Sequence, residues 1–378
     1  MPSEAGTGSS MLHVVTVVGA RPQFIKAAVV SRAMKAMDER VRETIVHTGQ
    51  HYDHGMSDVF FEELDIPRPD HHLGIGGGTH GQNTGRMIEA IESVLMAERP
   101  DRVLVYGDTD STLAGALAAV KLHLPVAHVE AGLRSFNRRM PEEINRVVTD
   151  HVSSLLLTPT NLATANLVRE GISGPGVIQV GDVMFDAAIY YREKAEAASR
   201  ILDILDLSGK GYVLATIHRA ENTDNTARMN GILAGLAKCP LPVVLPVHPR
   251  TASRLKAASI ELPANVRAIA PVGYLDMVQL ERHASMIATD SGGVQKEAFF
   301  HGVPCVTLRE ETEWVELVEL RANCLVGTDV DRIESRLSRA GVERLSQEAL
   351  EARPYGAGDA GERVAEALLA SSHDHSGT

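Results

Sequence analysis

The chain has 378 residues, which is too long for one ordinary hydrophobic core and predicts two domains. Its formal net charge is -12 and it has no basic run, which disfavours non-specific binding to nucleic acid. Three widely separated cysteines are typical of a reducing cytoplasm and provide neither a disulfide framework nor a zinc site. We therefore expect a cytoplasmic globular protein without a membrane span.

The two ends of the chain differ in composition from the rest. Residues 1–10, MPSEAGTGSS, lack the basic and apolar regions of a signal peptide and are predicted to be a disordered leader. Residues 373–378 are predicted to be a disordered tail, and we do not expect the histidines near this end to bind a metal.

Apolar runs typical of strands alternate with helical patterns in two series, predicted as domains 11–182 and 183–357. The first series contains VVTVVG, TIVHTG, VLVYGD, PVAHVE, LLLTPT and VIQVG, and the second contains YVLATI, PVVLPVH, VRAIAPV, ASMIATD and PCVTL. Such alternation predicts parallel sheets covered by helices on both faces. The fold class is therefore α/β, with two Rossmann-like doubly wound domains facing each other across a cleft, and a last helix, 358–372, returning to the first domain.

One polar segment, TDSGGVQKEA, joins a predicted buried strand to a helix. Ser291, Gly292 and Gly293 would place a hydroxyl and unpaired helix N–H groups where a phosphate can bind. Glu297 lies one helical turn further on and could accept hydrogen bonds from two ribose hydroxyls. The segment therefore indicates a nucleoside-diphosphate site, although a serine N-cap followed by glycines for tight packing would have the same pattern.

The segment TDSGGVQKEA also resembles the nucleotide-diphosphate motif of the UDP-N-acetylglucosamine 2-epimerase family, which has a GT-B fold. Other similar segments follow the family order from Leu12 to about Tyr355: GARPQFIKAA, TGQHYD, YGDTDST, HVEAGLRSFNRRMPEEINR, TIHRAEN, PVHPR and LREETEWVEL. The resemblance implies a non-hydrolysing isomerase that interconverts UDP-GlcNAc and UDP-ManNAc by eliminating UDP to 2-acetamidoglucal and adding it back. It implies no cofactor and no metal, and we expect a homodimer.

Three carboxylates are candidates for the chemistry. Asp108 and Glu130 end the predicted strands VLVYGD and PVAHVE, and Glu142 begins a helix. From the residues alone, Asp108 could equally be an N-cap and Glu142 a first-turn glutamate that satisfies the helix dipole. The resemblance matches all three to catalytic acids of the family. It matches His218, in TIHRAEN, to the histidine at the leaving phosphate.

Four further residues are candidates for substrate binding. Arg21 resembles the family contact to the diphosphate, and Lys26 is expected to face the same cleft unless it is a solvated helix residue. Arg134 is a further phosphate candidate. The uracil is expected to stack near PVGYLD, with Tyr274 or nearby backbone supplying contacts.

Two polar segments have less specific patterns. Asp108 and Asp110 form the Asp-x-Asp pair that metal-dependent glycosyltransferases use, but the resemblance implies that the family needs no metal. Asp110 would add a charge near the catalytic acids. The glycine-rich run Gly74–Gly85 lacks the Gly-Lys-Ser/Thr of a P-loop and is predicted to be a mobile loop.

A second UDP-GlcNAc site activates bacterial members of the family. Its residues are matched here by Gln50, His51, Arg86 and His248, of which His248 is also a candidate for substrate binding. The alternative is that the two histidines simply line the cleft wall.

Three other functions remain open at this point. A hydrolysing epimerase would release ManNAc and UDP from the same site. A GT-B glycosyltransferase would use an acceptor, whose side the acids of HVEAGLRSFNRRMPEEINR would occupy. A nucleotide-sugar sensor would have no need of three carboxylates. The pathway served, whether surface polysaccharide or a specialised metabolite, is not readable from the sequence.

Overall fold

The computed structural model describes residues 11–37, 40–50, 61 and 64–371, and the chain divides into two compact units. Unit 1 comprises residues 1–187 and 354–378, and unit 2 comprises residues 188–353. The predicted leader, the predicted tail and His51 lie outside the described residues. In the described part, no helix is long and apolar enough to cross a membrane.

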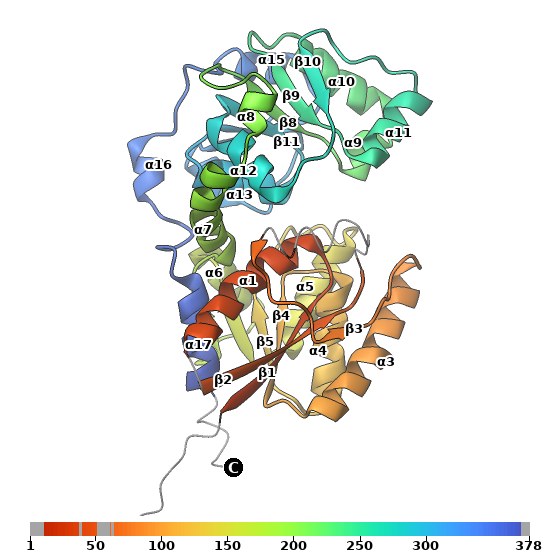
Figure 1. Cartoon of the computed structure of the whole chain (residues 1–378), viewed down its shortest axis with the longest axis vertical. Helices are drawn as coiled ribbons and strands as arrows, with labels where there is room; N and C mark the ends of the chain where they lie inside the picture. The colour runs from red at the N-terminus through yellow and green to blue at the C-terminus, as the bar shows by residue number, and fades with distance from the viewer. Residues whose placement is uncertain (1–10, 38–39, 51–60, 62–63, 372–378) are drawn as a thin grey trace, which may run out of the picture. The chain divides into compact units, whose positions relative to one another are not determined.

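Unit 1 is built on a seven-stranded parallel sheet with the strand order β3-β2-β1-β4-β5-β6-β7 (Figure 1). Its strands are β1 (Leu12–Val18), β2 (Val41–His47), β3 (His71–His72), β4 (Arg102–Tyr106), β5 (Val126–Val129), β6 (Leu155–Thr158) and β7 (Val177–Gln179). Its helices are α1 (Arg21–Ala36), α3 (His80–Glu98), α4 (Asp110–Lys121), α5 (Pro141–Val152), α6 (Asn161–Arg169) and α17 (Ala360–Ala370).

Unit 2 has a six-stranded parallel sheet with the order β10-β9-β8-β11-β12-β13. Its strands are β8 (Val213–Thr216), β9 (Val243–Pro246), β10 (Val266–Ile269), β11 (Met286–Thr289), β12 (Cys305–Thr307) and β13 (Asn323–Leu325). Its helices are α8 (Ile201–Ile204), α9 (Ala220–Thr223), α10 (Thr226–Ala237), α11 (Pro249–Ala257), α12 (Tyr274–His283), α13 (Gly292–Phe300), α14 (Val315–Glu319), α15 (Val330–Leu337) and α16 (Gln347–Glu351), while α7 (Val183–Ala198) runs from unit 1 into unit 2.

The predicted α/β class with two parallel-sheet domains is confirmed, and the differences concern short elements. The sequence pattern missed β3 and β13, because strands of two and three residues carry no readable periodicity. The run Gly74–Gly85 is only partly a loop. Thr79 caps α3 by accepting a hydrogen bond from the Gln82 N–H, so that residues 80–85 are helical.

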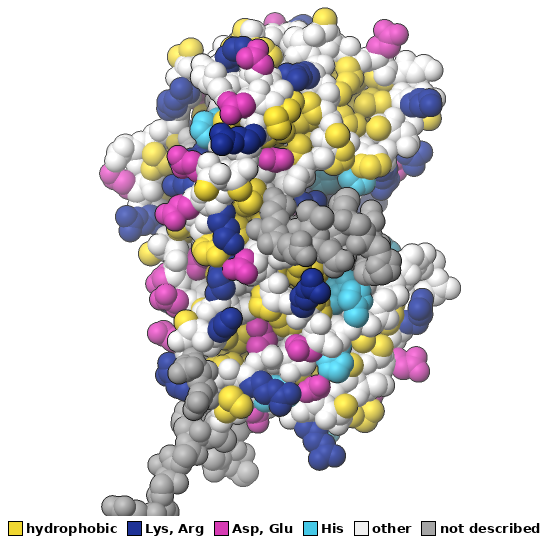
Figure 2. Space-filling view, viewed as in Figure 1, with side chains coloured by type: hydrophobic (Ala, Val, Ile, Leu, Met, Phe, Trp, Pro, Cys, Tyr) yellow, Lys and Arg dark blue, Asp and Glu magenta, His cyan; other side chains and the backbone are white. Residues whose placement is uncertain are grey.

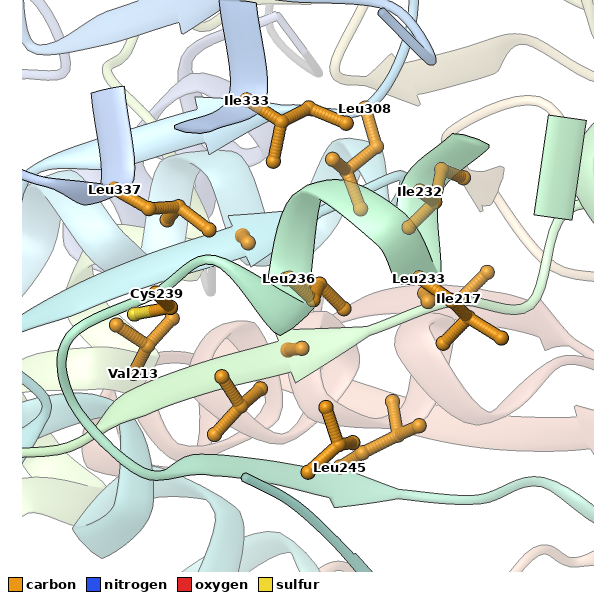
Figure 3. Packing of buried hydrophobic residues seen from close by; sticks show 14 of the residues in the cluster. Val213, Ile217, Ile232, Leu233, Leu236, Cys239, Leu245, Leu308, Ile333 and Leu337 are labelled. Carbon is orange, nitrogen blue, oxygen red and sulfur yellow. The ribbon is translucent and has the colours of Figure 1, made fainter. Parts of the chain in front are cut away.

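The cores of both units follow from strand periodicity, and unit 2 shows it most clearly. Alternate residues of β8 point to opposite faces, so that Val213 joins one buried cluster and Leu214 the other. In Figure 3, Leu236 and Ile232 of α10 lie over the sheet, with Ile232 on the side of Ile217, and Ile333 of α15 belongs to the same cluster. Each such buried aliphatic side chain contributes about 1.5–3 kcal/mol to folding. Helices on both faces therefore hold the strand ends in fixed positions.

The surface carries charges of both signs. On the face drawn in Figure 2, acidic and basic side chains are interspersed over the surface rather than separated by sign. That face therefore has no extended basic area of the kind that binds nucleic acid.

Candidate active site

Two of the predicted catalytic acids lie at the carboxyl edge of the unit 1 sheet. Strands β4 and β5 are parallel neighbours, with Tyr106 beside Val129 at their ends. Asp108 follows β4 after one residue, and Glu130 follows β5 directly. Because parallel strands end at one edge, the topology brings these acids to the same edge of the sheet, where ligands of doubly wound domains bind.

Glu130 is held in a constrained position. Its side chain is buried and forms an ion pair with Lys26 of α1, and its backbone has a left-handed φ of 69°. Gly107 allows this arrangement. A Cβ at Gly107 would lie 3.3 Å from Glu130 Oε2 and 3.4 Å from Lys26 Nζ, and the residue itself has a φ of 64°. A side chain at position 107 would therefore be strained and would crowd the ion pair.

Asp108 is paired with a cation that the sequence analysis did not single out. The Arg146 guanidinium, on α5, forms an ion pair with Asp108 Oδ2 through Nη2. Its Nη1 donates to Glu143 Oε2 at 2.9 Å. The Arg146 side chain is buried, whereas Asp108 is 31% exposed. The alternative of Asp108 as an N-cap is wrong, because Thr109 caps α4 by accepting a hydrogen bond from the Thr112 N–H.

Glu142 is the second residue of α5 and is exposed. Pro141 opens the helix, which positions Glu142 near the positive end of the helix dipole. Within the described residues, Glu142 forms no hydrogen bond or ion pair, in contrast to the neighbouring Glu143, which is buried. Its side chain therefore has room to reach a ligand, and the dipole reading of this residue remains compatible with the same position.

Asp110 connects three helices. Its carboxylate lies 2.8 Å from His80 Nδ1 of α3 and accepts a hydrogen bond of 3.1 Å from the Asn145 side chain of α5. The same Asn145 amide donates to the Asp108 carbonyl at 3.0 Å. Asp110 thus fixes the first turn of α4 against the helices that surround the acids. Among the described residues, no three His, Cys, Asp or Glu side chains gather as a metal site.

The nucleotide candidates of unit 2 gather at the start of α13. Ser291 is the N-cap and accepts from the Val294 N–H at 3.4 Å, while its own N–H donates to Thr289 Oγ1 at 2.9 Å. Gly292 and Gly293 form the first turn, where backbone N–H groups have no helical acceptor. The helix has nine residues, and its first turn lies at the carboxyl edge of β11. This geometry is suited to a phosphate.

Asp290 organises the neighbouring turn and orients His218. Its buried carboxylate accepts from the backbone N–H groups of His218 and Arg219 and from the Asn222 side chain, at 3.0–3.2 Å. The His218 Nδ1 lies 3.1 Å from Asp290 Oδ1. Burial alone would raise the pKa of Asp290, but His218 and Asn222 lower it below its ordinary value. The histidine is 49% exposed, and with Nδ1 bonded to Asp290 its Nε2 is available to a ligand.

Glu297 lies in α13 behind this turn and is largely buried. The Tyr274 hydroxyl is 3.4 Å from Glu297 Oε1. The Tyr274 ring is itself buried and packs edge-on against Tyr191 of α7, with centroids 5.4 Å apart. Burial, with the nearby Glu297 charge, raises the pKa of Tyr274 well above its ordinary value. The Tyr274 ring is therefore buried and buttresses Glu297, and the expected uracil site near PVGYLD, with Tyr274 or nearby backbone supplying contacts, stays a prediction.

Arg134 has a structural position. Its side chain is 1% exposed, and its guanidinium is engaged by Asp150 and by both oxygens of Glu170, each at 2.7 Å. Burial would lower the pKa of Arg134, but these carboxylates raise it above its ordinary value. A guanidinium that is already engaged by two carboxylates has little capacity left for a diphosphate, so this geometry argues against the expected phosphate contact.

The remaining candidates are placed as follows. Arg21 is the first residue of α1 and is partly exposed. Gln50 lies beside α4, where its side-chain oxygen accepts from Ser111 Oγ at 2.7 Å. Arg86 is exposed on α3, and the exposed His248 caps α11 through its ring, accepting from the Arg250 N–H at 3.2 Å. The proposed activator site therefore stays a prediction.

Comparisons with known proteins identify the family. A family model described as UDP-N-acetylglucosamine 2-epimerase matches residues 33–369. The chain belongs to the UDP-N-acetylglucosamine 2-epimerase family. The crystal structure of the UDP-GlcNAc 2-epimerase of Methanocaldococcus jannaschii, in complex with UDP-GlcNAc and UDP, has a TM-score of 0.86 and 42% identity, and the match covers 95% of this chain and 99% of that chain.

The relatives of this epimerase family that match over nearly the whole chain do not share one substrate name. A UDP-2,3-diacetamido-2,3-dideoxy-D-glucuronate 2-epimerase of Pseudomonas aeruginosa is 51% identical over 362 residues, which are 94% of this chain and 99% of that protein. A UDP-N-acetylglucosamine 2-epimerase of Methanocaldococcus jannaschii is 44% identical over 362 residues, covering 93% and 97%. The chain is therefore an epimerase of UDP-sugars with a GT-B-like fold.

The sequence analysis missed several polar residues of this epimerase fold that the structure brings to the two edges. Arg146 and Asp290 both stand inside segments that were quoted for other residues. Arg309 was also missed; it is buried and donates to both oxygens of Glu313, at 3.0 and 3.2 Å. No local signal marked this last pair, because Arg309 and Glu313 lie in a segment that is not helical, where a spacing of four residues does not predict an ion pair.

Proposed function

We propose that this epimerase inverts C2 of UDP-GlcNAc to give UDP-ManNAc, without hydrolysis, by eliminating UDP and adding it back. The observation that carries the proposal is the pair of acids at one sheet edge, each with its own cation: Asp108 with Arg146, and Glu130 with Lys26. On this proposal unit 1 acts on the sugar, and unit 2 binds the nucleotide.

The chemistry explains why carboxylates are needed. The C2 hydrogen of the sugar has no carbonyl beside it and is not acidic. In the elimination, a carboxylate takes the C2 proton, the C2–H electron pair forms the C1=C2 double bond, and the C1–O electron pair leaves with UDP. Positive charge that develops at C1 is stabilised by a nearby carboxylate. Return of UDP to C1, with a proton delivered to the other face of C2, gives the epimer.

Three acids can share the two proton transfers. Lys26 and Arg146 hold Glu130 and Asp108 in defined positions, and Glu142 is the exposed member that can move. General acid–base groups of this kind contribute about 10²–10⁴-fold each. The order in which they act on the two faces is left open by this proposal.

The leaving UDP requires donors, and unit 2 supplies them. The start of α13, with Ser291, is proposed to bind the diphosphate, and Glu297 the ribose hydroxyls. His218 is proposed to stabilise the departing phosphate through Nε2, since Asp290 occupies Nδ1. Arg21 is proposed as a further contact to the diphosphate.

A direct experiment tests the proposal. The protein is incubated with UDP-GlcNAc and EDTA in D2O, and the sugar anomeric signals are followed by NMR. We expect UDP-ManNAc carrying deuterium at C2, because elimination breaks the C2–H bond. A product without deuterium at C2 would exclude elimination. Free ManNAc with stoichiometric UDP would identify a hydrolysing epimerase instead.

A second substrate is favoured by one specific observation. The Pseudomonas aeruginosa relative, named for a diacetamido uronate, is 51% identical to this chain, compared with 44% for the Methanocaldococcus jannaschii UDP-GlcNAc 2-epimerase over the same number of residues. The same NMR experiment is therefore run with UDP-2,3-diacetamido-2,3-dideoxy-D-glucuronate. Turnover of this sugar alone would assign it as the substrate and would overturn the choice of UDP-GlcNAc.

A further inference from the structure

The second glutamate of the α5 first turn, Glu143, is the centre of a buried hydrogen-bond network. It is 2% exposed, and its carboxylate accepts four hydrogen bonds of 2.9 Å each. Three come from the loop that precedes α5, namely from the Ser135 N–H, the Ser135 hydroxyl and the Phe136 N–H. The fourth comes from Arg146 Nη1. A carboxylate that accepts this many donors is fixed in one orientation.

The loop end of this network holds an unusual backbone conformation. Phe136 has a φ of 59°, in the left-handed region that residues with a Cβ rarely adopt. Its side chain is 70% exposed, so no packing of the ring accounts for the conformation. The hydrogen bond from the Phe136 N–H to Glu143 is the contact that holds it there. Residues kept in such conformations by a surrounding network often serve function.

The other end of the network reaches a proposed catalytic acid. Arg146 lies between two carboxylates, with Nη1 on Glu143 and Nη2 on Asp108. Its side chain is buried, so that the planar guanidinium cannot turn toward one partner without losing the other. The position of Glu143 therefore determines where Arg146 holds the Asp108 carboxylate.

We propose that Glu143 is a positioning residue that links the loop Ser135–Met140 to the orientation of Asp108 through Arg146. The loop leads directly into α5, in which Glu142 is the second residue. The buried Glu143 carboxylate therefore fixes the position of the loop before Glu142 and, through Arg146, the position of Asp108. The catalytic part of this inference rests on the proposed function, whereas the loop part stands on the contacts of Glu143 alone.

The first measurement does not depend on the reaction. Trypsin cleaves after Arg138 and Arg139, which lie in the loop at its surface. In Glu143→Gln, the amide retains one acceptor oxygen and loses the charge, so the loop should open more often. We expect cleavage at these two sites, followed by mass spectrometry, to be at least about tenfold faster than in the wild type. Unchanged cleavage would contradict the proposal that Glu143 holds the loop.

The second measurement separates positioning from binding. With the sugar that the wild type turns over, Glu143→Gln should lower kcat by at least about tenfold and change KM by less than about threefold. Faster cleavage with unchanged kcat would overturn the link to Asp108. A wild type that turns over no UDP-sugar would contradict the proposed function, and the trypsin result would still decide whether Glu143 holds the loop.

Two further variants test whether the effects of Glu143→Gln come only from a general loss of stability. Ser135→Ala removes one of the four donors and leaves the buried carboxylate in place, so we expect about threefold changes in the same directions. Glu98→Gln is the matched control, because Glu98 likewise contacts an arginine, Arg42, and a second polar side chain, His71, 2.8 Å away, but lies in another helix, at the end of α3. This variant should leave both the rate of loop cleavage and kcat at wild-type values. Equal changes in Glu98→Gln would mean that the effects of Glu143→Gln come from general destabilisation.

Discussion

The two sheet edges use buried polar groups in opposite ways. In unit 1, cations hold the acids in place: Arg146 holds Asp108, and Lys26 holds Glu130. In unit 2, an acid holds the donors in place, because Asp290 collects two backbone N–H groups and the His218 ring. Unit 1 thus presents carboxylates, and unit 2 presents donors and a helix start. The difference suits a reaction in which a proton is taken from the sugar while an anionic nucleotide departs.

The strongest way to test this contrast is to remove charge from the unit 1 edge. Asp108→Asn keeps the size of the side chain but cannot take a proton, and it loses the charge that pairs with Arg146. We expect turnover to fall by about 10²–10⁴-fold. UDP affinity, measured by titration calorimetry, should stay within about twofold, because Asp108 is assigned no contact to the nucleotide. A large loss of UDP affinity would contradict the assignment of the sugar chemistry to unit 1 and of the nucleotide to unit 2.

A glutamate of unit 1, Glu43, should make the stability of that unit depend on pH. Glu43 of β2 accepts a hydrogen bond from the Thr16 hydroxyl at 2.6 Å, and burial raises its pKa from 4.5 to about 7. A pKa raised on folding stabilises the fold fully below about 4.5, and this contribution is lost as the pH rises through about 7. The shift corresponds to about 3 kcal/mol. The glutamine in Glu43→Gln does not titrate, so the stability of unit 1 should no longer lose this contribution as the pH rises.

Hydrogen exchange can assign that effect to one unit. Between about pH 4.5 and 8, wild-type β2 should lose protection relative to Glu43→Gln by about 3 kcal/mol in opening free energy, after correction for intrinsic exchange. Strand β8 of unit 2 should show no difference between the two proteins. Equal pH dependence of β2 in both proteins would mean that Glu43 does not titrate in this range.

Much of the fold could be predicted from the sequence, and the reason is local. Apolar runs such as VLVYGD and ASMIATD fix a buried parallel strand and the polar residue that follows it. Asp108, Glu130 and Ser291 could therefore be assigned to strand ends from residue order alone. The short strands β3 and β13 could not, because their pairing and not their composition makes them strands.

The site was less predictable wherever a residue depends on a distant partner. Arg134 seemed available to a phosphate, but Glu170 lies 36 residues away in the chain and engages its guanidinium. Arg146 meets Asp108 across 38 residues. Tyr274 was a candidate contact for the uracil, but Tyr191 from another helix packs against its ring. Local pattern cannot reveal such contacts, because it carries no information on which residues the topology brings together.

The ribose contact proposed for unit 2 can be tested by truncation. Glu297→Ala removes a carboxylate that would accept two hydroxyls and should weaken UDP binding by about 1–3 kcal/mol. The rate of C2 deuteration at saturating substrate should change much less, because the acids lie in unit 1. An unchanged Kd for UDP in titration calorimetry would remove Glu297 from the site.

The helix caps offer the smallest and most closely matched test. Thr109 caps α4 in unit 1, and Ser291 caps α13 in unit 2, each through its hydroxyl to a backbone N–H. Replacing either by Ala should cost about 1 kcal/mol of stability in its unit, seen by calorimetry as a fall of about 2–4 °C in the melting temperature. Because Ser291 and not Thr109 is proposed to contact the diphosphate, the two variants should differ in UDP affinity.

The two variants should differ in UDP affinity because only one of the two hydroxyls is proposed to contact the nucleotide. The Ser291 hydroxyl is proposed to contact the diphosphate, so Ser291→Ala should raise the Kd for UDP about fivefold, which corresponds to about 1 kcal/mol. Thr109→Ala should leave this Kd unchanged, because Thr109 caps a helix at the edge that presents carboxylates. Equal weakening in both variants would show that UDP affinity follows general stability. Weakening by Thr109→Ala alone would place the diphosphate in unit 1 and reverse the assignment of the two edges.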